Sequence, residues 1–357
     1  MSTHTPLQVG IVGHGFATTT FHAPLVQSVP GLRLAAMASR KPEDVRAAWP
    51  GIDALPTPEA LFAREDIDLV VIPTPNDSHH PLALAALRAG KHVVVDKPFT
   101  LDVAQADELV AEAERRGRML SVFHNRRWDA DFLTVQALVQ AGTLGRLAHV
   151  ESHFDRYRPQ VRARWREGAG PGSGLWFDLG PHLLDQTLQL FGMPHRIGLE
   201  LAAHRDGALA DDWFHAVLAY EDGPHAGLRV VLHGSALVAE CGPRFALHGT
   251  QGSYVKFGLD PQEDQLKAGL RPGQPGWGLD TRHGTLTTAR GDALHTVVHP
   301  TLPGDQSCYY ATLRDAILHG GKVPVAASEA RDVMRLIEAG QRSAATGHRV
   351  ETRPSGS

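Results

Sequence analysis

Short apolar runs alternate with helix-like segments through the first third of the chain. Continuous apolar strands separated by helices are typical of a parallel sheet that is covered on both faces. The predicted strands are 7–13, 32–39, 67–73, 91–96 and 118–123, and the predicted helices are 17–29, 41–50, 80–90 and 102–117. Right-handed crossovers make such a sheet doubly wound. The sequence therefore predicts a dinucleotide-binding (Rossmann) domain over residues 1–123.

The pattern of predicted helices and strands changes after residue 124. Two helical patterns, at 128–141 and 178–191, are followed by strand-like stretches with few helices between them, which indicates a mainly antiparallel sheet. The predicted strands are 146–154, 197–205, 213–220, 226–235, 244–249 and 253–258. Residues 259–304 are rich in Gly, Pro and Asp and are expected to form loops with short hairpins. Helices at 305–319 and 328–342 complete an α+β domain over 124–357.

Composition excludes several classes of protein. The chain has 357 residues, and its 35 basic and 39 acidic residues give a net charge of −4, so a general polyanion-binding surface is not expected. Cys241 and Cys308 cannot form a disulfide framework and fit a reducing compartment, so we expect a cytoplasmic protein. We find no signal peptide and no membrane-spanning segment. The 21 histidines are scattered and no Cys/His cluster has zinc spacing, so no metal is expected.

A glycine-rich turn follows the first predicted strand directly. Gly13 and Gly15 match the first two glycines of the GxGxxG fingerprint, whereas Thr18 replaces the third. Gly13 lets the chain turn tightly, and Gly15 lets the backbone approach a pyrophosphate at the following helix N-terminus. Such glycines also occur in ordinary strand–helix turns. The position of this turn, between a strand and a helix at the start of the chain, favours a nucleotide site.

The end of the second strand bears on the choice of nucleotide. NAD sites usually carry a carboxylate there for the ribose 2′-hydroxyl, but this strand ends in Ala38, Ser39, Arg40 and Lys41. A cation and a hydroxyl suit a 2′-phosphate, so NADP is preferred and NAD remains possible. Alternatively, Arg40 and Lys41 merely solvate the start of a helix.

The third apolar strand ends in a second polar segment. Pro73, Thr74, Pro75 and Asn76 follow it, either as a lining for the nicotinamide ribose or as a plain turn in which Asn76 or Asp77 caps the next helix. His79 and His80 begin that helix, and we interpret them as surface or packing residues rather than a metal pair. The residues expected at the cofactor are Gly13, His14, Gly15, Phe16, Ala17, Ser39, Arg40, Pro73, Thr74, Pro75, Asn76, His79, Asp96, Lys97, Arg126 and Trp165.

Two segments could manage a proton during hydride transfer. Asp96 and Lys97 end a buried strand at the cleft side of the sheet. Asp178 and His182 are four residues apart, so they share one helix face, and a histidine paired with a carboxylate has a fixed tautomer suited to proton transfer. Their alternative roles are structural, with Asp178 at a helix N-terminus and His182 as a satisfied core histidine.

These segments resemble the Gfo/Idh/MocA oxidoreductase family over essentially the full length. The resemblance rests on VGIVGHG (9–15), on VDKPF (95–99) in place of the EKP motif, and on GSGLWFDLGPHLLDQ (172–186) with its Asp-x-x-x-His. Residues 121–134, 151–167 and 254–264 narrow it to the branch that contains NADP-dependent scyllo-inositol 2-dehydrogenases. Asp96 replaces the longer family glutamate, and the third fingerprint glycine is missing.

The resemblance implies catalytic roles and an oligomer. His182 would accept the proton of the substrate hydroxyl in oxidation, Lys97 would polarise and orient that hydroxyl, and Asp178 would bind the substrate or hold His182. The C-terminal sheet usually mediates contacts between copies, so we expect a homodimer or homotetramer.

Arginine and aromatic segments indicate the substrate class, because they combine donors with apolar faces that suit a polyol or sugar. The residues expected at the substrate are His124, Arg127, Trp128, Arg156, Tyr157, Asp178, His182 and Tyr310. The basic stretch 156–166 could instead be solvated, and we do not expect a nucleic-acid partner because no binding module appears.

The leading hypothesis is an NADP(H)-dependent dehydrogenase that interconverts a cyclic polyol or sugar hydroxyl and its ketone, with a scyllo-inositol-like substrate. The alternatives are a reductase of another aldose, imine or enone substrate, and a non-catalytic NADP-binding sensor on the same fold.

Overall fold

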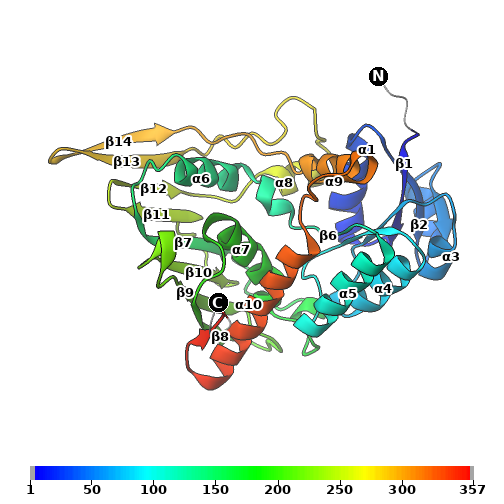
Figure 1. The fold of residues 1–357 in the computed structure, drawn as a ribbon, viewed down its shortest axis with the longest axis horizontal. Helices are drawn as coiled ribbons and strands as arrows, with labels where there is room; N and C mark the ends of the chain where they lie inside the picture. The colour runs from blue at the N-terminus through cyan, green and yellow to red at the C-terminus, as the bar shows by residue number, and fades with distance from the viewer. Residues whose placement is uncertain (1–4, 354–357) are drawn as a thin grey trace. The chain divides into compact units, whose positions relative to one another are not determined.

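A computed structural model describes residues 5–353. The chain divides into two compact units (Figure 1). The first unit comprises Met1–Trp128, Pro261–Gly278 and Asp305–Arg331. The second comprises Asp129–Asp260, Leu279–Gly304 and Asp332–Ser357.

The first unit contains a six-stranded parallel sheet in the order β3-β2-β1-β4-β5-β6. This is the strand order of a doubly wound dinucleotide fold, as predicted. The strands are β1 Leu7–Val12, β2 Leu32–Ala38, β3 Asp53–Leu55, β4 Leu69–Ile72, β5 His92–Val95 and β6 Leu120–Val122. The helices of this unit are α1 Ala23–Ser28, α2 Pro42–Ala48, α3 Pro58–Phe62, α4 His79–Arg88, α5 Val103–Arg116, α8 Gln262–Lys267 and α9 Ser307–His319, and α10 Ala327–Thr346 begins in it.

Apolar strands build the core of this sheet. Val9 and Ile11 of β1 have no exposed surface, and the strands beside β1 are buried in the same way. Gly10 lies against the side chain of Leu61 on α3, where a Cβ atom would come within 2.6 Å of it. The close contact between strand and helix therefore requires a glycine at this position.

The second unit contains a nine-stranded, mainly antiparallel sheet, as predicted, in the order β14-β13-β12-β11-β7-β10-β9-β8-β15. One internal pair, β7 with β10, is parallel. The strands are β7 Leu147–Asp155, β8 Arg196–Ala202, β9 Trp213–Ala219, β10 Arg229–Ser235, β11 Phe245–Gly249, β12 Gly252–Lys256, β13 Gly284–Arg290, β14 Ala293–His299 and β15 Val350–Glu351. Its helices are α6 Ala130–Gln140 and α7 Leu175–Phe191, with the end of α10.

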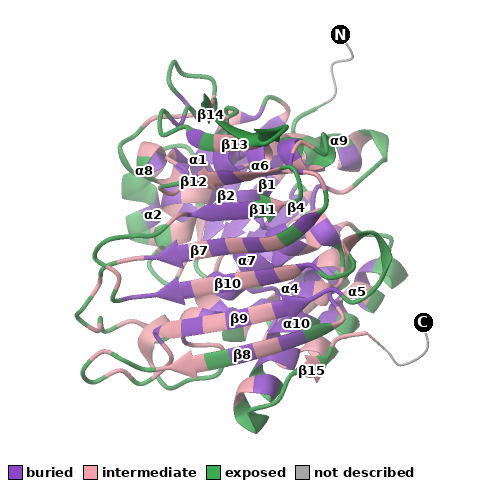
Figure 2. Ribbon diagram, turned by 90° about the vertical axis from the view of Figure 1, so that its left-hand side faces the viewer, coloured by how far each residue is buried: buried purple, intermediate pink, exposed green. Residues whose placement is uncertain are grey.

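Helix α7 packs against one face of this sheet, on β7, β9 and β10. Along these strands buried residues alternate with half-buried ones, and Figure 2 shows no helix over the face that is turned to the viewer. One face therefore forms the core under α7, and the other is open within this unit.

Arg244 joins α7 to its surroundings. Its guanidinium donates to Gln186 on α7 at 2.8 Å and to Ser152 on β7 at 2.6 Å, and it lies 3.3 Å from the carboxylate of Asp131 on α6. Arg244 is 3% exposed, so these contacts form a buried polar joint between two helices and the sheet.

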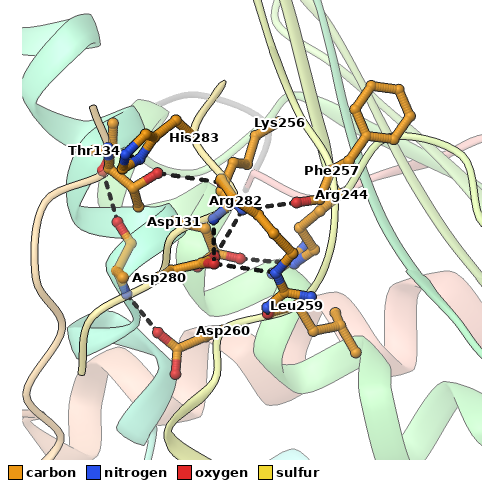
Figure 3. A network of polar contacts seen from close by, with 12 residues as sticks. Asp131, Thr134, Arg244, Lys256, Phe257, Leu259, Asp260, Asp280, Arg282 and His283 are labelled. Carbon is orange, nitrogen blue, oxygen red and sulfur yellow. Dashed lines mark hydrogen bonds and ion pairs between the residues drawn. The ribbon is translucent and has the colours of Figure 1, made fainter. Parts of the chain in front are cut away.

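A second buried ion pair lies near this joint (Figure 3). Lys256 Nζ is 2.8 Å from Asp280 Oδ2 and also donates to the Phe257 carbonyl oxygen at 2.7 Å. Arg282 contacts the other oxygen of Asp280 at 3.1 Å. These contacts hold the segment that precedes β13 against the end of β12.

Candidate functional site

The glycine turn follows β1 and lies against the carboxyl end of β2. Gly13 has φ +98°, and its N–H donates to the carbonyl oxygen of Ala38 at the end of β2. No heavy atom lies within 4 Å of the position that a Cβ of Gly15 would take, so its backbone is open to a ligand. The hydroxyl of Thr18 donates to the Gly13 carbonyl oxygen at 2.9 Å. The threonine that replaces the third glycine therefore closes the turn itself.

The other residues expected in this turn surround it. His14 Nε2 accepts a hydrogen bond from the Trp49 indole at 3.1 Å, and the Phe16 side chain is 58% exposed. At the end of β2, the Ser39 Oγ accepts the Lys41 N–H at 3.1 Å, which leaves its own hydroxyl hydrogen to donate. Arg40 beside it is exposed. This group of donors fits the phosphates of a dinucleotide.

The loop after β4 lies beside the glycine turn, because a Cβ on Gly13 would lie 3.7 Å from Thr74. The ring of His79 is buried, with Nε2 2.8 Å from the Thr74 carbonyl oxygen and Nδ1 2.8 Å from that of Pro98. Burial lowers the pKa of His79, so the neutral ring is favoured, and that ring donates to one of the two carbonyl oxygens at a time. His79 thus braces the loop after β4 against the segment that carries Lys97.

Asp96 follows β5 directly and accepts the backbone N–H of Lys97 at 2.7 Å. Burial alone would raise the pKa of Asp96, but interactions with His22, Lys97 and His79 outweigh burial and lower it to about 2. Asp96 is therefore a carboxylate at neutral pH, and Lys97 lies next to it at the carboxyl end of the sheet.

The segment after β6 is more buried than the sequence suggested. His124 is 1% exposed, Arg126 pairs with Glu263 at 3.1 Å, and Arg127 pairs with Glu329 at 2.7 Å. Trp128 packs on Tyr309 with ring centroids 5.8 Å apart. These ion pairs hold the segment to later parts of the same unit, and a role at substrate or cofactor remains a prediction.

Tyr310 is fully buried, and its hydroxyl lies 2.6 Å from Nδ1 of His22. Tyr310 is one of the residues expected at the substrate, and the structure encloses it in the core of the first unit. His22 had no role in the sequence prediction, and no local pattern links it to residues 96 and 310.

In the second unit, α7 begins at Leu175 and carries Asp178 and His182 near its N-terminal end. Gly174 precedes the helix with φ +96°, and a Cβ there would come within 2.0 Å of Asp211. Asp211 caps the helix, since its carboxylate accepts the Trp176 N–H at 2.7 Å and its carbonyl oxygen accepts the Leu175 N–H at 2.8 Å. Burial raises the pKa of Asp211 to about 6. The first turn of α7, with Asp178, is thus fixed by one glycine and by the half-buried cap Asp211.

Phe154 on β7 links two expected substrate residues. The Arg156 guanidinium lies 4.8 Å from the centre of its ring, and the His182 ring stacks on it at 6.5 Å. Arg166 lies 3.5 Å from Asp178 and 4.7 Å from the ring centre of Trp165. Tyr157 follows Arg156 in the chain and is 61% exposed.

Arginines line a cavity of about 30 Å³ at the start of α7, beside Asp178. The sequence assigns only Arg156 of this lining to the substrate, leaves a solvated role open for the basic stretch, and gives no role to Arg205. Arg205 contacts Glu167 at 3.0 Å and Asp212 at 2.9 Å, and so ties the basic segment to β9. The arginines of the lining are Arg156, Arg158, Arg164, Arg166 and Arg205.

Two family models match the chain. The model described as the oxidoreductase family, NAD-binding Rossmann fold, matches residues 7–124, and the model of its C-terminal alpha/beta domain matches residues 136–352. The chain belongs to the Gfo/Idh/MocA oxidoreductase family. It is accordingly an NAD(P)-binding oxidoreductase, as the resemblance implied.

Gfo/Idh/MocA relatives match most of the chain. The uncharacterized oxidoreductase YdgJ of Escherichia coli is 53% identical, covering 95% of this chain and 96% of that protein. The scyllo-inositol 2-dehydrogenase (NADP(+)) IolW of Bacillus subtilis is 38% identical, covering 94% and 93%. The structure of the putative oxidoreductase YPO2259 of Yersinia pestis is 50% identical, with a TM-score of 0.93 and 98% of both chains covered.

Within residues 5–353 no helix is long and apolar enough to cross a membrane. The same residues contain no group of three or more His, Cys, Asp or Glu side chains that could hold a metal ion.

Proposed function

We propose that this protein interconverts a secondary hydroxyl of a cyclic polyol or sugar and its ketone with NADP(H), and that a scyllo-inositol-like ring is its substrate. The observation that carries the proposal is the placement of Asp178 and His182 at the start of α7, where Asp178 lines a small cavity together with several arginines. Guanidinium donors and carboxylate acceptors together match the hydroxyl groups of a polyol. The name of the relative IolW supports the same substrate class.

The nicotinamide supplies or accepts the hydride when the cofactor is bound. In the proposed reaction His182 accepts the hydroxyl proton in the direction of oxidation and returns it in the direction of reduction. Lys97 donates a hydrogen bond to the oxygen on which negative charge develops. Asp178 accepts hydrogen bonds from the substrate and orients its ring.

NADP is the proposed cofactor. Ser39 and Arg40 follow β2, where a carboxylate would otherwise bind the ribose hydroxyls. An exposed guanidinium beside a free hydroxyl hydrogen suits a phosphate.

A screen at 340 nm tests the function. NADP and NAD would each be combined with inositols, aldoses and their keto forms. The proposal predicts the highest kcat/KM with an inositol or inosose and NADP(H). Turnover only with another aldose, an imine or an enone would show that the substrate belongs to that class instead. Tight NADPH binding without turnover on any of them would favour a sensor.

We also propose that a second copy of the chain covers the open face of the large sheet, in a homodimer or homotetramer. Half-buried side chains such as Trp213, His215 and Val217 lie along β9 on that face. The family usually associates through this sheet, which supports the proposal.

A further inference from the structure

A buried histidine lies behind the segment that carries Lys97. His22 has no exposed surface, and its Nε2 is 3.6 Å from Asp96 Oδ2. That Nε2 is buried without a hydrogen-bond partner among the described residues. A distance of 3.6 Å is longer than a hydrogen bond, so the ring and the carboxylate interact through space, as a polar N–H group and a charge.

The other ring nitrogen fixes the orientation of His22. Nδ1 lies 2.6 Å from the hydroxyl of Tyr310, which is itself fully buried. When Tyr310 donates to Nδ1, the ring proton is on Nε2 and points to Asp96. Phe123 packs on the His22 ring with centroids 4.3 Å apart and limits its rotation.

Asp96 in turn contacts the segment of Lys97. Its Oδ1 accepts the Lys97 N–H at 2.7 Å, while Oδ2 faces His22. Each carboxylate oxygen therefore has its own partner, one on each side. Interactions with His22, Lys97 and His79 lower the pKa of Asp96, and the buried hydroxyls of Tyr309 and Tyr310 also interact electrostatically with its carboxylate.

Asp96 differs from the acid of the family motif in the length of its side chain. The family motif has glutamate at this position, and aspartate is shorter by one methylene. A shorter side chain has less reach, so the carboxylate stays close to its own backbone, where Oδ2 lies 3.6 Å from His22 Nε2. His22 supplies this contact from the first helix, and Tyr310 holds His22 from α9.

We infer that Tyr310 and His22 form a positioning relay that holds Asp96, and through Asp96 orients Lys97 for the reaction. The inference rests on the proposed function of Lys97. The relay does not conduct protons, because Tyr310 has no exposed surface through which a proton could leave. His22 and Tyr310 are thus positioning residues and not catalytic ones.

A double-mutant cycle tests the relay. His22→Phe keeps a ring and removes both nitrogens, and Asp96→Asn removes the charge. Each variant is expected to lower kcat roughly 10–100-fold with little change in KM, as is usual when an orienting group is lost. In the Asp96→Asn background, His22→Phe is expected to change kcat less than about twofold, because both act on one residue. Fully additive losses would overturn the relay.

Two further variants separate positioning from packing. Tyr310→Phe removes one hydroxyl and is expected to lower kcat in the same direction, but less than His22→Phe. Asp96→Glu in the His22→Phe background restores the longer acid and is expected to recover part of kcat. His80→Phe is the matched control, since His80 lies on the outer side of α4 with Glu108, and its kcat should not change. Equal losses in His22→Phe and His80→Phe would contradict the inference.

A readout without turnover keeps the inference independent of the substrate. Reductive ¹³C-methylation labels the lysine amines, and the Lys97→Arg variant assigns the signal of Lys97. NMR then follows the titration of this amine in the protein without cofactor. Both Asp96→Asn and His22→Phe are expected to lower the apparent pKa of Lys97, and the double variant is expected to match Asp96→Asn. An unchanged Lys97 titration in His22→Phe would overturn the relay. Absence of turnover in the wild type would instead contradict the proposed function.

Discussion

Single residues at the strand ends explain most of the candidate cofactor site. Gly13 and Gly15 could be predicted because each satisfies a local requirement, a positive φ or an open backbone. The contacts of His22 with Asp96 and Tyr310 could not be predicted, because they join residues far apart in the chain. Composition predicts Arg127 and Tyr310 as ligand contacts, but it could not predict their protein partners, the half-buried Glu329 and the buried His22.

Arg40 tests the cofactor preference. Arg40→Ala should raise the KM for NADP about tenfold or more and leave that for NAD within about twofold, because losing a charged hydrogen bond costs roughly 1.5–3 kcal/mol. Steady-state kinetics with both cofactors measure the two effects. Lys41→Ala, one residue further on, is the matched control. Equal losses with NADP and NAD would show that Arg40 does not contact a 2′-phosphate.

Asp211 predicts a pH effect on stability. Its pKa is raised to about 6 by burial, so the folded state holds the proton more tightly than the unfolded chain. The contribution of this group to the free energy of unfolding is therefore fully present below about pH 4. It falls as the pH rises to about 6, by on the order of 2 kcal/mol.

Asp211→Asn keeps an oxygen that can accept the Trp176 N–H and removes the titration. Thermal unfolding between pH 4 and pH 7 should show a smaller loss of stability in this variant than in the wild type. Parallel pH profiles would show that Asp211 is not protonated in the folded protein.

Among the helices and strands, apolar runs could be predicted even where they are short, as in β6, whereas short elements without such a run could not. The strands of the first sheet were recognised from apolar runs, and the change to alternating burial separated the second sheet from the first. The elements β3, α3 and α8 were missed, because three to six residues carry no measurable period. The hairpin of β13 and β14 is longer than expected, since its strands consist largely of exposed and half-buried residues.

Arg244 is the joint between α7 and the rest of its unit. Arg244→Met should lower the free energy of unfolding by about 3–5 kcal/mol, because it leaves the Asp131 carboxylate buried without its cation. Urea unfolding measures this loss. Arg196→Met, on an exposed ion pair of β8, is the control and should cost less than about 1 kcal/mol. A loss of similar size in both variants would contradict the role of Arg244.

For the whole molecule, the family membership and the class of reaction follow from both units together. Lys97 belongs to the first unit, whereas Asp178 and His182 belong to the second. The proposed function therefore assigns a role in the reaction to residues of each unit. Composition alone could exclude a disulfide framework, but it could not reveal which face of the large sheet remains open.

Val217 tests the proposed association. Val217→Asp places a charge in the open face of the sheet, next to Val231 and Gly198 on the neighbouring strands. Light scattering after size-exclusion chromatography should show a lower mass than for the wild type, with far-UV circular dichroism unchanged. A wild-type mass equal to one chain, 38.6 kDa, would contradict the oligomer directly.

The most direct measurement is the rate of NADPH oxidation with scyllo-inosose, for the wild type and for Lys97→Met and His182→Asn. The account predicts turnover by the wild type and a kcat lowered roughly 10²–10⁴-fold in each variant, with the Kd of NADPH nearly unchanged. Turnover close to wild type in both variants would contradict the assignment of Lys97 and His182 as the residues that manage the substrate proton.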